Sequence, residues 1–421
     1  MCGFIVSREG EFVDERTVWR RGPDLRNSIE AQGFVFTHYL LHVTGEFNPQ
    51  PIVSDNIVCV FNGEIYNYPF TKSDGEVLIP LYQEYGPDFL SKLDGEFAVA
   101  LYDFEKRIAV FSTDAFGTKP LWINNLSSAS YESCIGGLRL PPNTTLVASL
   151  DDCRRYIQPV YRFDFEHQHK TTFDDWISAF DLAIRKRAKD GCFIGLSSGY
   201  DSGAIACELS KQNIKFKAYS IRGSEDLNIL GERLKKLDNE FFQLTRSDYE
   251  SAQRFIKQHA EEFCYGSIRE VNFHFDNMTD DWGAVGLSYI CRRAQTEGRK
   301  VFLSGQGADE ILCDYSLTPE ISTLRGMYSV NLKMWPNFHG GCQRAFLTKE
   351  EYISGAYGIE GRYPFLDASL VQEFLWLKPE LKNSEYKAPL YHYLKRNNYP
   401  FKVREKVGFS AGHNLLDSAI A

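Results

Sequence analysis

The chain has 421 residues, of which 47 are basic and 56 acidic, so its formal net charge at pH 7 is −9. This length suits two or three domains with sizeable cores, and the acidic balance excludes a broadly basic surface for nucleic acid or anionic membranes. No stretch approaches the ~18 apolar residues of a membrane span, and MCGFIVSREGEF lacks the pattern of a signal peptide. We therefore expect a cytoplasmic protein with no nucleic-acid partner and no membrane partner.

The first part of the chain, up to about residue 125, alternates short apolar β-runs with turn residues. The runs are CGFIVS, GFVFTHYLL, NIVCVFNGEIYN, FAVALYDF, IAVFSTD and PLWINN, and one helical stretch, DGEVLIPLYQEYG, interrupts them. This pattern predicts an α+β domain. Residues 126–172 are rich in turn formers and predict a crossing segment.

From about residue 173 helical and strand patterns alternate. FDDWISAFDLAIRKRAKD, SGAIACELSKQN, LNILGERLKKLD and YESAQRFIKQHAEEF predict helices, whereas CFIGLS, FKAYSI, EFFQLT and KVFLSGQ predict strands. Buried strands between amphipathic helices are typical of an α/β doubly wound parallel sheet, whose ligands bind at the carboxyl ends of strands. The predicted domains are 1–160 and 161–421.

Ten cysteines are spread along the chain without one CxxC pair, several of them inside apolar runs such as NIVCVF. Cysteine in such a run usually behaves as a small buried hydrophobe. The spacing predicts neither a disulfide framework nor a zinc site, which agrees with a reducing compartment.

Cys2 is a candidate nucleophile, because removal of the preceding methionine would leave it with a free α-amine of pKa about 8 as its own base. On this position alone an ordinary buried cysteine is the favoured interpretation. Asn62 and Gly63 follow a strand and offer a side-chain amide and a flexible backbone NH, both of which suit an oxyanion. Simple turns and a helix cap would also account for NGEIYN, RGPD and SDGE.

Taken together, MCG, RGPD, NGEIYN, SDxE and FAVALYD followed by DxxGxxPL resemble the glutaminase domain of class II amidotransferases over residues 1–122. The resemblance implies an Ntn-hydrolase fold in which Cys2 attacks the glutamine side-chain amide. It also implies that Asn62 and Gly63 hold the oxyanion and that Glu64 and Asp74 receive the substrate's α-amino group.

One position departs from this family, which usually carries an arginine for the glutamine carboxylate in a His-x-Arg-Leu strand. Here the stretch is His38-Tyr39-Leu40-Leu41, and Leu40 cannot make a bidentate carboxylate contact. Either another cation, with Arg21 as the candidate, replaces it, or glutamine binds weakly or differently.

Two loops in the second half each follow a predicted buried strand. The first loop follows Ile194-Gly195 and has the sequence Leu196-Ser197-Ser198-Gly199-Tyr200-Asp201-Ser202. Its small hydroxylated residues at a helix start suit an anion. Ser304-Gly305-Gln306-Gly307-Ala308-Asp309-Glu310 again places carboxylates at a helix start. The first loop alone is equally explained by a capped helix, but two such loops in one sheet can share a phosphate and Mg²⁺ site.

These loops resemble the SGGxDS pyrophosphate loop of N-type ATP pyrophosphatases and the SGEGSDE loop of asparagine synthetases. GIEGRYPFLD (358–367) and REKVGFS (404–410) resemble further segments of the same enzymes, so the chain is identified as a member of the glutamine-hydrolysing asparagine synthetase family. The resemblance implies ATP and Mg²⁺ as cofactors, with Asp201 and Asp309 on the metal and Lys406 neutralising charge at the α-phosphate. The implied pyrophosphate and ATP contacts are Leu196, Ser197, Ser198, Gly199, Asp201, Ser202, Ser304 and Gly305.

Gln306 is a second departure, because asparagine synthetases carry glutamate there in the acceptor site. A neutral amide cannot act as a base, so the acceptor need not be aspartate, and Glu360 is a nearby candidate base.

Three functions follow. The leading one is glutamine-dependent and ATP-dependent amide formation on a carboxylate through an acyl-adenylate, with aspartate the foremost single acceptor and other carboxylic acids open. The second is a ligase that uses free ammonia or an amine, which Leu40 favours and the Cys2 motif set opposes. The third is a non-catalytic nucleotide-binding descendant, which Asp201, Asp309 and Lys406 oppose. The expected partners are small molecules (glutamine, ATP and a carboxylic acid), with a homodimer as an open assembly.

Overall fold

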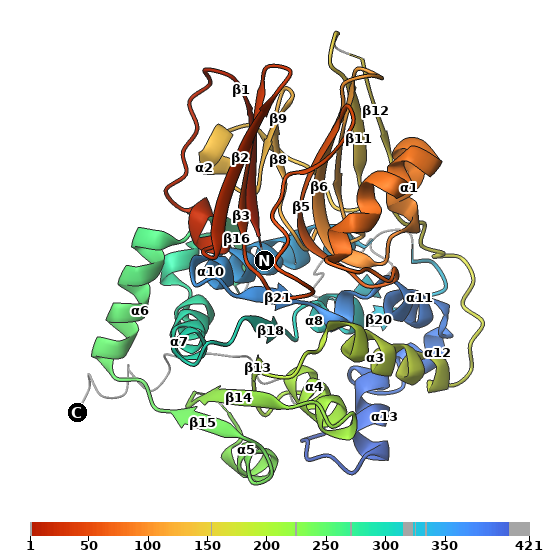
Figure 1. The fold of residues 1–421 in the computed structure, drawn as a ribbon. Coiled ribbons are helices and arrows are strands. Elements are labelled where there is room, and N and C mark those ends of the chain that lie inside the picture. Colours follow the sequence, from red (N-terminus) through yellow and green to blue (C-terminus); the bar gives the residue numbers. More distant parts are fainter. Residues whose placement is uncertain are drawn as a thin grey trace. The chain divides into compact units, whose positions relative to one another are not determined.

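The computed structural model describes residues 2–152, 154–223, 225–269, 272–314, 323–324, 326–332 and 335–403. The chain forms two compact units (Figure 1). The N-terminal unit comprises Met1–Arg162, His259–Glu261 and Ser354–Glu360, and the C-terminal unit comprises Phe163–Gln258, Glu262–Ile353 and Gly361–Ala421. Within the described ranges, no helix has the length and apolar character needed to cross a membrane.

Two antiparallel six-stranded sheets form the N-terminal unit. In spatial order the first sheet contains β10 (Leu138–Arg139), β8 (Trp122–Asn124), β9 (Ser127–Ala129), β1 (Gly3–Arg8), β3 (Phe34–Leu40) and β2 (Leu25–Ala31). The second contains β12 (Arg155–Gln158), β11 (Thr145–Ser149), β7 (Ile108–Thr113), β6 (Gly95–Asp103), β5 (Ile57–Ile65) and β4 (Ile52–Ser54).

Alternation along the strands builds two apolar layers on the second sheet. Val58 and Val60 of β5 face the first sheet and pack in one cluster with Phe4 of β1 and Phe36 of β3. The intervening residues of β5 pack on the other face with α1 (Leu78–Tyr85). Since successive strand residues point to opposite faces, the continuous apolar run of β5 supplies both layers. The predicted strand-rich α+β architecture is confirmed.

The helical stretch 74–86 is real but is divided into three parts. It begins as the 3-10 helix η2 (Asp74–Val77), continues as α1 and ends in the 3-10 helix η3 (Gly86–Lys92). The first half of the unit also contains η1 (Val18–Arg21).

The interpretation of 126–172 as a crossing segment is wrong up to residue 158. β9, β10, β11 and β12 lie there together with the short helix α2 (Glu132–Ile135), and these strands extend both sheets to their edges. They are two to five residues long, and most of β12 is exposed. Short, polar edge strands leave little of the periodicity on which a sequence-based prediction depends.

Two short segments from late in the chain complete the N-terminal unit. The Glu261 carboxylate accepts hydrogen bonds from the Ser133 backbone NH at 2.8 Å and from the Thr17 hydroxyl at 3.0 Å. Gly355 lies so close to the Tyr131 hydroxyl and the Arg21 side chain that an added Cβ would come within 2.7–3.2 Å of them. No sequence pattern indicated that these segments belong to the first unit.

The C-terminal unit is built on a five-stranded sheet in the order β15 (Asn239–Phe242), β14 (Phe216–Ile221), β13 (Cys192–Gly195), β18 (Val301–Leu303) and β21 (Glu360–Arg362). β13 pairs in parallel with both β14 and β18, and β14 with β15. The predicted doubly wound α/β fold is therefore confirmed, and all four strands predicted for this sheet are present.

Helices accompany this sheet along the chain (Figure 1). They are α3 (Asp174–Arg187), α4 (Tyr200–Lys211), α5 (Leu227–Leu234), α6 (Arg246–His259), α7 (Trp282–Thr296), α8 (Ala308–Leu312), α9 (Pro336–His339), α10 (Gly341–Ala356), α11 (Ala368–Trp376), α12 (Pro379–Lys382) and α13 (Ala388–Arg396), with the 3-10 helices η4 (Met278–Asp280) and η5 (Pro364–Leu366). Two hairpins, β16 (Cys264–Arg269) with β17 (Asn272–Asn277) and β19 (Thr323–Leu324) with β20 (Met327–Tyr328), lie outside the main sheet. Because β13 and β18 are parallel neighbours, the loops that follow them emerge at the same edge of the sheet.

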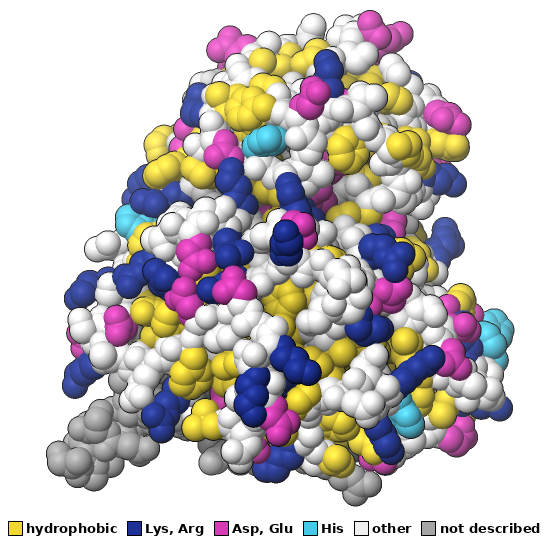
Figure 2. Space-filling model, turned by 60° about the horizontal axis from the view of Figure 1, so that its bottom comes forward, with side chains coloured by type: hydrophobic (Ala, Val, Ile, Leu, Met, Phe, Trp, Pro, Cys, Tyr) yellow, Lys and Arg dark blue, Asp and Glu magenta, His cyan; other side chains and the backbone are white. Residues whose placement is uncertain are grey.

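Charged side chains of both signs are interspersed on the face of the molecule shown in Figure 2. They do not gather by sign on that face. The expectation that the protein has no nucleic-acid partner stays a prediction.

A buried ion pair fixes α11 to α3. Asp367 is 1% exposed, caps α11 by accepting from the backbone NH groups of Ser369 and Leu370, and lies 2.7 Å from Nη1 of the equally buried Arg187. Burial raises the pKa of Asp367, but the charges of Arg187 and Lys186 outweigh that effect and hold it below its ordinary value.

We expect Asp367→Ala to destabilise the protein by about 3–5 kcal/mol, because it leaves the Arg187 guanidinium buried without its carboxylate and removes a helix cap. The matched control is Asp174→Ala, whose pair with Arg396 is more than 60% exposed on both sides and contributes about 1 kcal/mol or less. Urea denaturation followed by circular dichroism measures both. Equal losses in the two variants would contradict the prediction.

Candidate active sites

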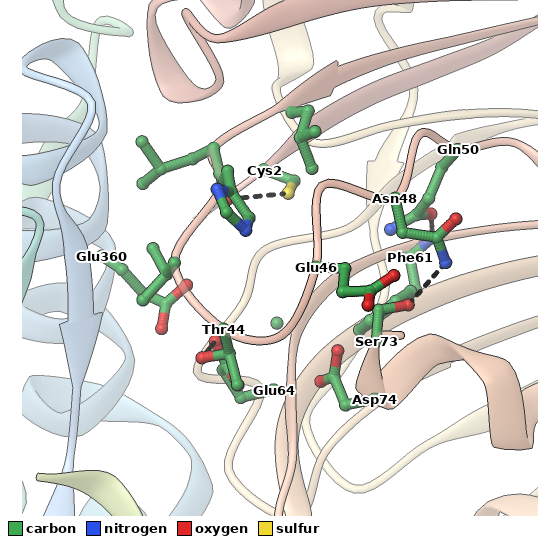
Figure 3. A pocket seen from close by; sticks show the side chains of 15 residues that line it. Cys2, Thr44, Glu46, Asn48, Gln50, Phe61, Glu64, Ser73, Asp74 and Glu360 are labelled. Carbon is green, nitrogen blue, oxygen red and sulfur yellow. Dashed lines mark hydrogen bonds between the residues drawn. The ribbon is translucent and has the colours of Figure 1, made fainter. Parts of the chain in front are cut away.

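A small cavity of about 40 Å³ lies in the N-terminal unit, beside the start of β1 and the ends of β3 and β5 (Figure 3). Four of the predicted glutaminase residues line it: Cys2, Gly63, Glu64 and Asp74. They come from separate segments, so the fold brings together side chains that only the motif comparison had linked.

Cys2 is buried directly before β1, and its Sγ lies 3.9 Å from the carbonyl oxygen of Leu41. Its own carbonyl accepts a hydrogen bond of 2.9 Å from Nε of Arg21, which holds the backbone at this position. Burial raises the pKa of the Cys2 thiol to about 11. The thiol is therefore protonated near neutrality and needs an adjacent base to become a nucleophile.

Asn62 and Gly63 sit within β5, next to this cavity. The Asn62 side chain is completely buried, and neither its Nδ2 nor its Oδ1 has a hydrogen-bond partner among the described residues. A buried amide without hydrogen-bond partners destabilises the folded protein, so an oxyanion that accepts a hydrogen bond from Nδ2 would remove part of this unfavourable free energy. Gly63 has φ of +142°, and a Cβ there would stand 1.8 Å from the Glu96 carbonyl oxygen, so only glycine fits.

Local contacts hold the two predicted ammonium ligands in place. Oε1 of Glu64 accepts from the Thr44 hydroxyl at 2.8 Å, and Oδ2 of Asp74 accepts from the Ile65 backbone NH at 2.8 Å. Asp74 begins η2 behind the capping residue Ser73, which explains why the SDGE segment points its first carboxylate at the end of β5. In Figure 3 both carboxylates face the same hollow.

The structure does not bring Arg21 to this cavity. Arg21 is fully buried, and besides the Cys2 carbonyl its guanidinium reaches the Tyr131 hydroxyl at 3.1 Å. In this geometry Arg21 holds the backbone at Cys2 and does not line the cavity, so its predicted contact with a glutamine carboxylate stays a prediction. Sequence reasoning missed this because the RGPD turn gives no sign of where its side chain points.

Glu360 is also placed differently from the expectation. It is 2% exposed and lines the Cys2 cavity, whereas we had expected it near Gln306. It does not line the cavity of the C-terminal unit that contains Gln306. Its predicted function as the acceptor base stays a prediction without a contact to support it.

The C-terminal unit contains a larger cavity of about 360 Å³ between the loops that follow β13 and β18. Most of the predicted nucleotide and acceptor residues line it: Ser197, Gly199, Asp201, Ser202, Ser304, Gly305, Gln306 and Asp309. Helices α7 and α10 supply another part of the wall through Leu287, Ile290, Phe346, Lys349 and Glu350. The size and the mixed polar and apolar lining suit a nucleotide with a small acceptor beside it.

Two predicted pyrophosphate contacts do not line this cavity. Leu196 is buried, with its backbone NH bonded to the Tyr219 carbonyl oxygen. The backbone NH and the hydroxyl of Ser198 both donate to one carboxylate oxygen of Glu225, the hydroxyl at 2.7 Å. The Glu225 carboxylate therefore accepts the Ser198 hydrogen bonds that we had predicted for a phosphate oxygen.

Asp201 and Asp309 converge on a single cation, the ammonium of Lys387. Nζ lies 2.7 Å from both carboxylate oxygens of Asp201 and 2.7 Å from Oδ1 of Asp309. Burial lowers the pKa of Lys387, but the two carboxylates outweigh it and hold it well above its ordinary value. Two carboxylates that converge on one cation also suit Mg²⁺, because proteins usually bind Mg²⁺ through few carboxylates while phosphate oxygens complete its coordination shell. Sequence reasoning missed Lys387, because SEYKAPLY resembles an ordinary helix start.

Two further carboxylates in this cavity were missed, those of the buried Glu310 and the half-buried Glu350. Burial and the neighbouring Asp309 raise the pKa of Glu310 to about 8, and burial raises the pKa of Glu350 to about 7. Both line the cavity. A carboxylate that titrates near neutrality can exchange protons with a substrate, so either group is a candidate base in place of Gln306.

Lys406, predicted to neutralise charge at the α-phosphate, lies outside the described residues. The assignment remains a prediction.

Two family models match the chain in succession. A glutamine amidotransferase domain matches residues 11–176, and asparagine synthase matches residues 178–331. Together they span the segments that contain most of the residues lining the two cavities.

Curated proteins resemble the chain over most of its length. The putative asparagine synthetase [glutamine-hydrolyzing] 1 of Methanocaldococcus jannaschii is 29% identical over 395 residues, which are 83% of this chain and 70% of the relative. Asparagine synthetase [glutamine-hydrolyzing] 2 of Arabidopsis thaliana is 25% identical over 427 residues, 91% of this chain and 72% of the relative. Among solved structures, NMN synthetase from Francisella tularensis covers 57% of this chain and 100% of that chain with 11% identity and a TM-score of 0.25. So distant a likeness carries no argument about the reaction.

Proposed function

The chain belongs to the family of glutamine-hydrolysing asparagine synthetases, and we propose that it transfers the side-chain nitrogen of glutamine to a carboxylate activated by ATP. The observation that carries this proposal is the convergence of Asp201 and Asp309, from two different loops, on one cation in a nucleotide-sized cavity. A binding protein would not need this arrangement beside the further carboxylates of Glu310 and Glu350, which line the same cavity.

In the N-terminal unit Cys2 attacks the carbon of the glutamine amide. Its α-amine, once the preceding methionine is removed, takes the thiol proton and passes it to the departing ammonia. The oxyanion is stabilised by Nδ2 of Asn62 and the backbone NH of Gly63. The unpartnered state of the buried Asn62 amide and the glycine-only conformation at position 63 support these roles.

In the C-terminal unit the acceptor carboxylate attacks the α-phosphorus of ATP, releasing pyrophosphate and forming an acyl-adenylate that ammonia then converts to an amide. Ser197, Gly199 and Ser202 line the cavity at the start of α4 and can donate hydrogen bonds to the departing pyrophosphate. Mg²⁺, held by Asp201 and Asp309, would neutralise charge on the phosphate oxygens. Lys387, which contacts both carboxylates, supplies a further positive charge beside the phosphates, and Glu310 or Glu350 accepts the proton lost by ammonia.

One assay tests the proposed function as a whole. The protein is supplied with glutamine, ATP, Mg²⁺ and a panel of carboxylic acids that includes aspartate, and glutamate, AMP and pyrophosphate are quantified. We expect equal amounts of AMP and pyrophosphate, released only when an acceptor is present. Release of ADP and phosphate, or no acceptor-dependent release from any acid, would contradict the proposal.

The acceptor is the open part of this function. Gln306 lines the cavity between the two metal-site loops and provides no negative charge for a substrate ammonium group. We propose that aspartate is a poor acceptor for this protein and that a carboxylic acid without an ammonium group beside its reacting carboxyl is preferred.

We expect Gln306→Glu to raise asparagine formation from aspartate by about tenfold or more, since one charged contact shifts discrimination by roughly a few kcal/mol. The matched control is Gln83→Glu, which adds the same charge to an exposed position of α1. Asparagine is quantified by amino-acid analysis for all three proteins. If the unmodified protein already forms asparagine as fast as Gln306→Glu does, the acceptor proposal is wrong.

A further inference from the structure

The cavity that contains Cys2 is lined by four carboxylates, those of Glu46, Glu64, Asp74 and Glu360. Among the described residues that line it, none is lysine or arginine. Three of these four side chains, Glu64, Asp74 and Glu360, are less than 8% exposed, so solvent screens their charges poorly. The electrostatic character of this cavity therefore favours a positively charged end of a substrate and opposes a negative one.

Three described positions at or near the cavity bear on whether a carboxylate could bind there: Leu40, Arg21 and His42. Leu40 ends β3 and contributes an apolar wall that can donate no hydrogen bond. Nearby, the Arg21 guanidinium is engaged with the Cys2 carbonyl and the Tyr131 hydroxyl. The imidazole Nε2 of His42 lies 3.1 Å from the Gly45 carbonyl oxygen, inside its own turn.

Free glutamine carries an ammonium group and a carboxylate on the same carbon. Glu64 and Asp74 suit the ammonium group, but the carboxylate would enter among like charges without the bidentate cation that usually receives it. A glutamine whose α-carboxyl is bound in an amide or peptide keeps the favourable contact and loses the repulsive one. It also keeps the side-chain amide that Cys2 attacks.

We propose that this cavity selects glutamine residues whose α-carboxyl group is blocked and whose α-amine is free, in preference to free glutamine. This inference rests on the proposed glutaminase function and deepens it by naming the substrate class. The reaction is hydrolysis: Cys2 Sγ bonds to the side-chain carbonyl carbon as the C–N bond breaks and ammonia leaves, and water then cleaves the thioester. The products are ammonia and a glutamate residue whose α-carboxyl is still blocked.

The test compares free L-glutamine with L-glutamine α-methylamide, whose α-carboxyl is a neutral secondary amide. Ammonia release is measured for the full-length protein with ATP and a carboxylic acid present, and release by Cys2→Ala is subtracted as the background from spontaneous cyclisation. We expect kcat/KM for the α-methylamide to exceed that for free glutamine by about tenfold or more. Equal or higher kcat/KM for free glutamine overturns the inference while leaving the proposed glutaminase intact.

Leu40→Arg supplies a second, independent readout. It places a guanidinium on the cavity wall, so we expect the preference to move toward free glutamine by about tenfold or more, mainly through KM. Leu138→Arg is the matched control, because Leu138 is an exposed residue of β10 that does not line the cavity. An unchanged preference in Leu40→Arg that is folded by circular dichroism would also overturn the inference. No Cys2-dependent ammonia from either amide would instead refute the glutaminase function itself.

Discussion

Cys2→Ala is expected to lower glutamine-dependent ammonia release by about four orders of magnitude or more, because it removes the atom that bonds to the amide carbon. The cavity around position 2 contains no other thiol among the described residues, so no neighbouring side chain can take over this step. The same variant should still form the amide product when ammonium chloride is supplied at high concentration. Ammonia release and product formation are measured on the same preparation, with and without glutamine.

The control is Cys264→Ala, which removes an exposed thiol in the C-terminal unit and should leave both activities unchanged. Glutaminase activity that persists in Cys2→Ala would show that another residue is the nucleophile. Loss of the ammonium-dependent activity as well would indicate damage beyond the glutaminase site, which circular dichroism would detect.

Asp309→Asn should lower acceptor-dependent pyrophosphate release by about a thousandfold or more, the effect of several kcal/mol on the transition state. The substitution keeps the size of the side chain but removes one of the two charges that converge on Lys387 at 2.7 Å. Asp201→Asn should behave alike, since Lys387 contacts both of its oxygens. A coupled assay for pyrophosphate, run over a range of Mg²⁺ concentrations, measures the loss.

Asp55→Asn is the control for that experiment, because Asp55 is exposed in the turn between β4 and β5 and an asparagine tolerates its left-handed backbone. Near wild-type pyrophosphate release in either Asp201→Asn or Asp309→Asn would rule out the shared metal site. Partial recovery at raised Mg²⁺ would support it, since a weakened site fills at higher metal concentration.

Much of the fold could be predicted because its signals are local. The alternating apolar runs of β5 and β6 and the amphipathic periods of α3 and α4 are each determined by neighbours within one element. β2 was not predicted, because its apolar residues Leu25, Ile29 and Ala31 alternate with polar ones and form no continuous apolar run. The strands of 138–158 were missed because they are short and lie at or next to sheet edges.

Some residues of the candidate sites could be predicted from motifs, and others could be found only from the structure. Cys2, Asp201 and Asp309 could be proposed because each sits in a motif whose spacing is preserved in the sequence. Lys387 and Glu350 could not, since their significance comes from their position beside loops far away in the chain, which no local pattern records. Arg21 illustrates the converse: the correct motif was recognised, but the side chain supports the Cys2 backbone and does not line the cavity.

The N-terminal unit is assembled from segments that lie far apart in the sequence, and this affects when it can be completed during synthesis. A ribosome releases residues 1–162 long before 354–360, so the nascent chain holds both sheets while Gly355 and Glu360 have not yet been synthesised. N-terminal domains generally fold first during synthesis, but here the wall that Glu360 provides can be added only after most of the second unit has emerged. The glutaminase cavity is thereby completed late in translation, and a truncated chain that ends at residue 162 lacks part of it.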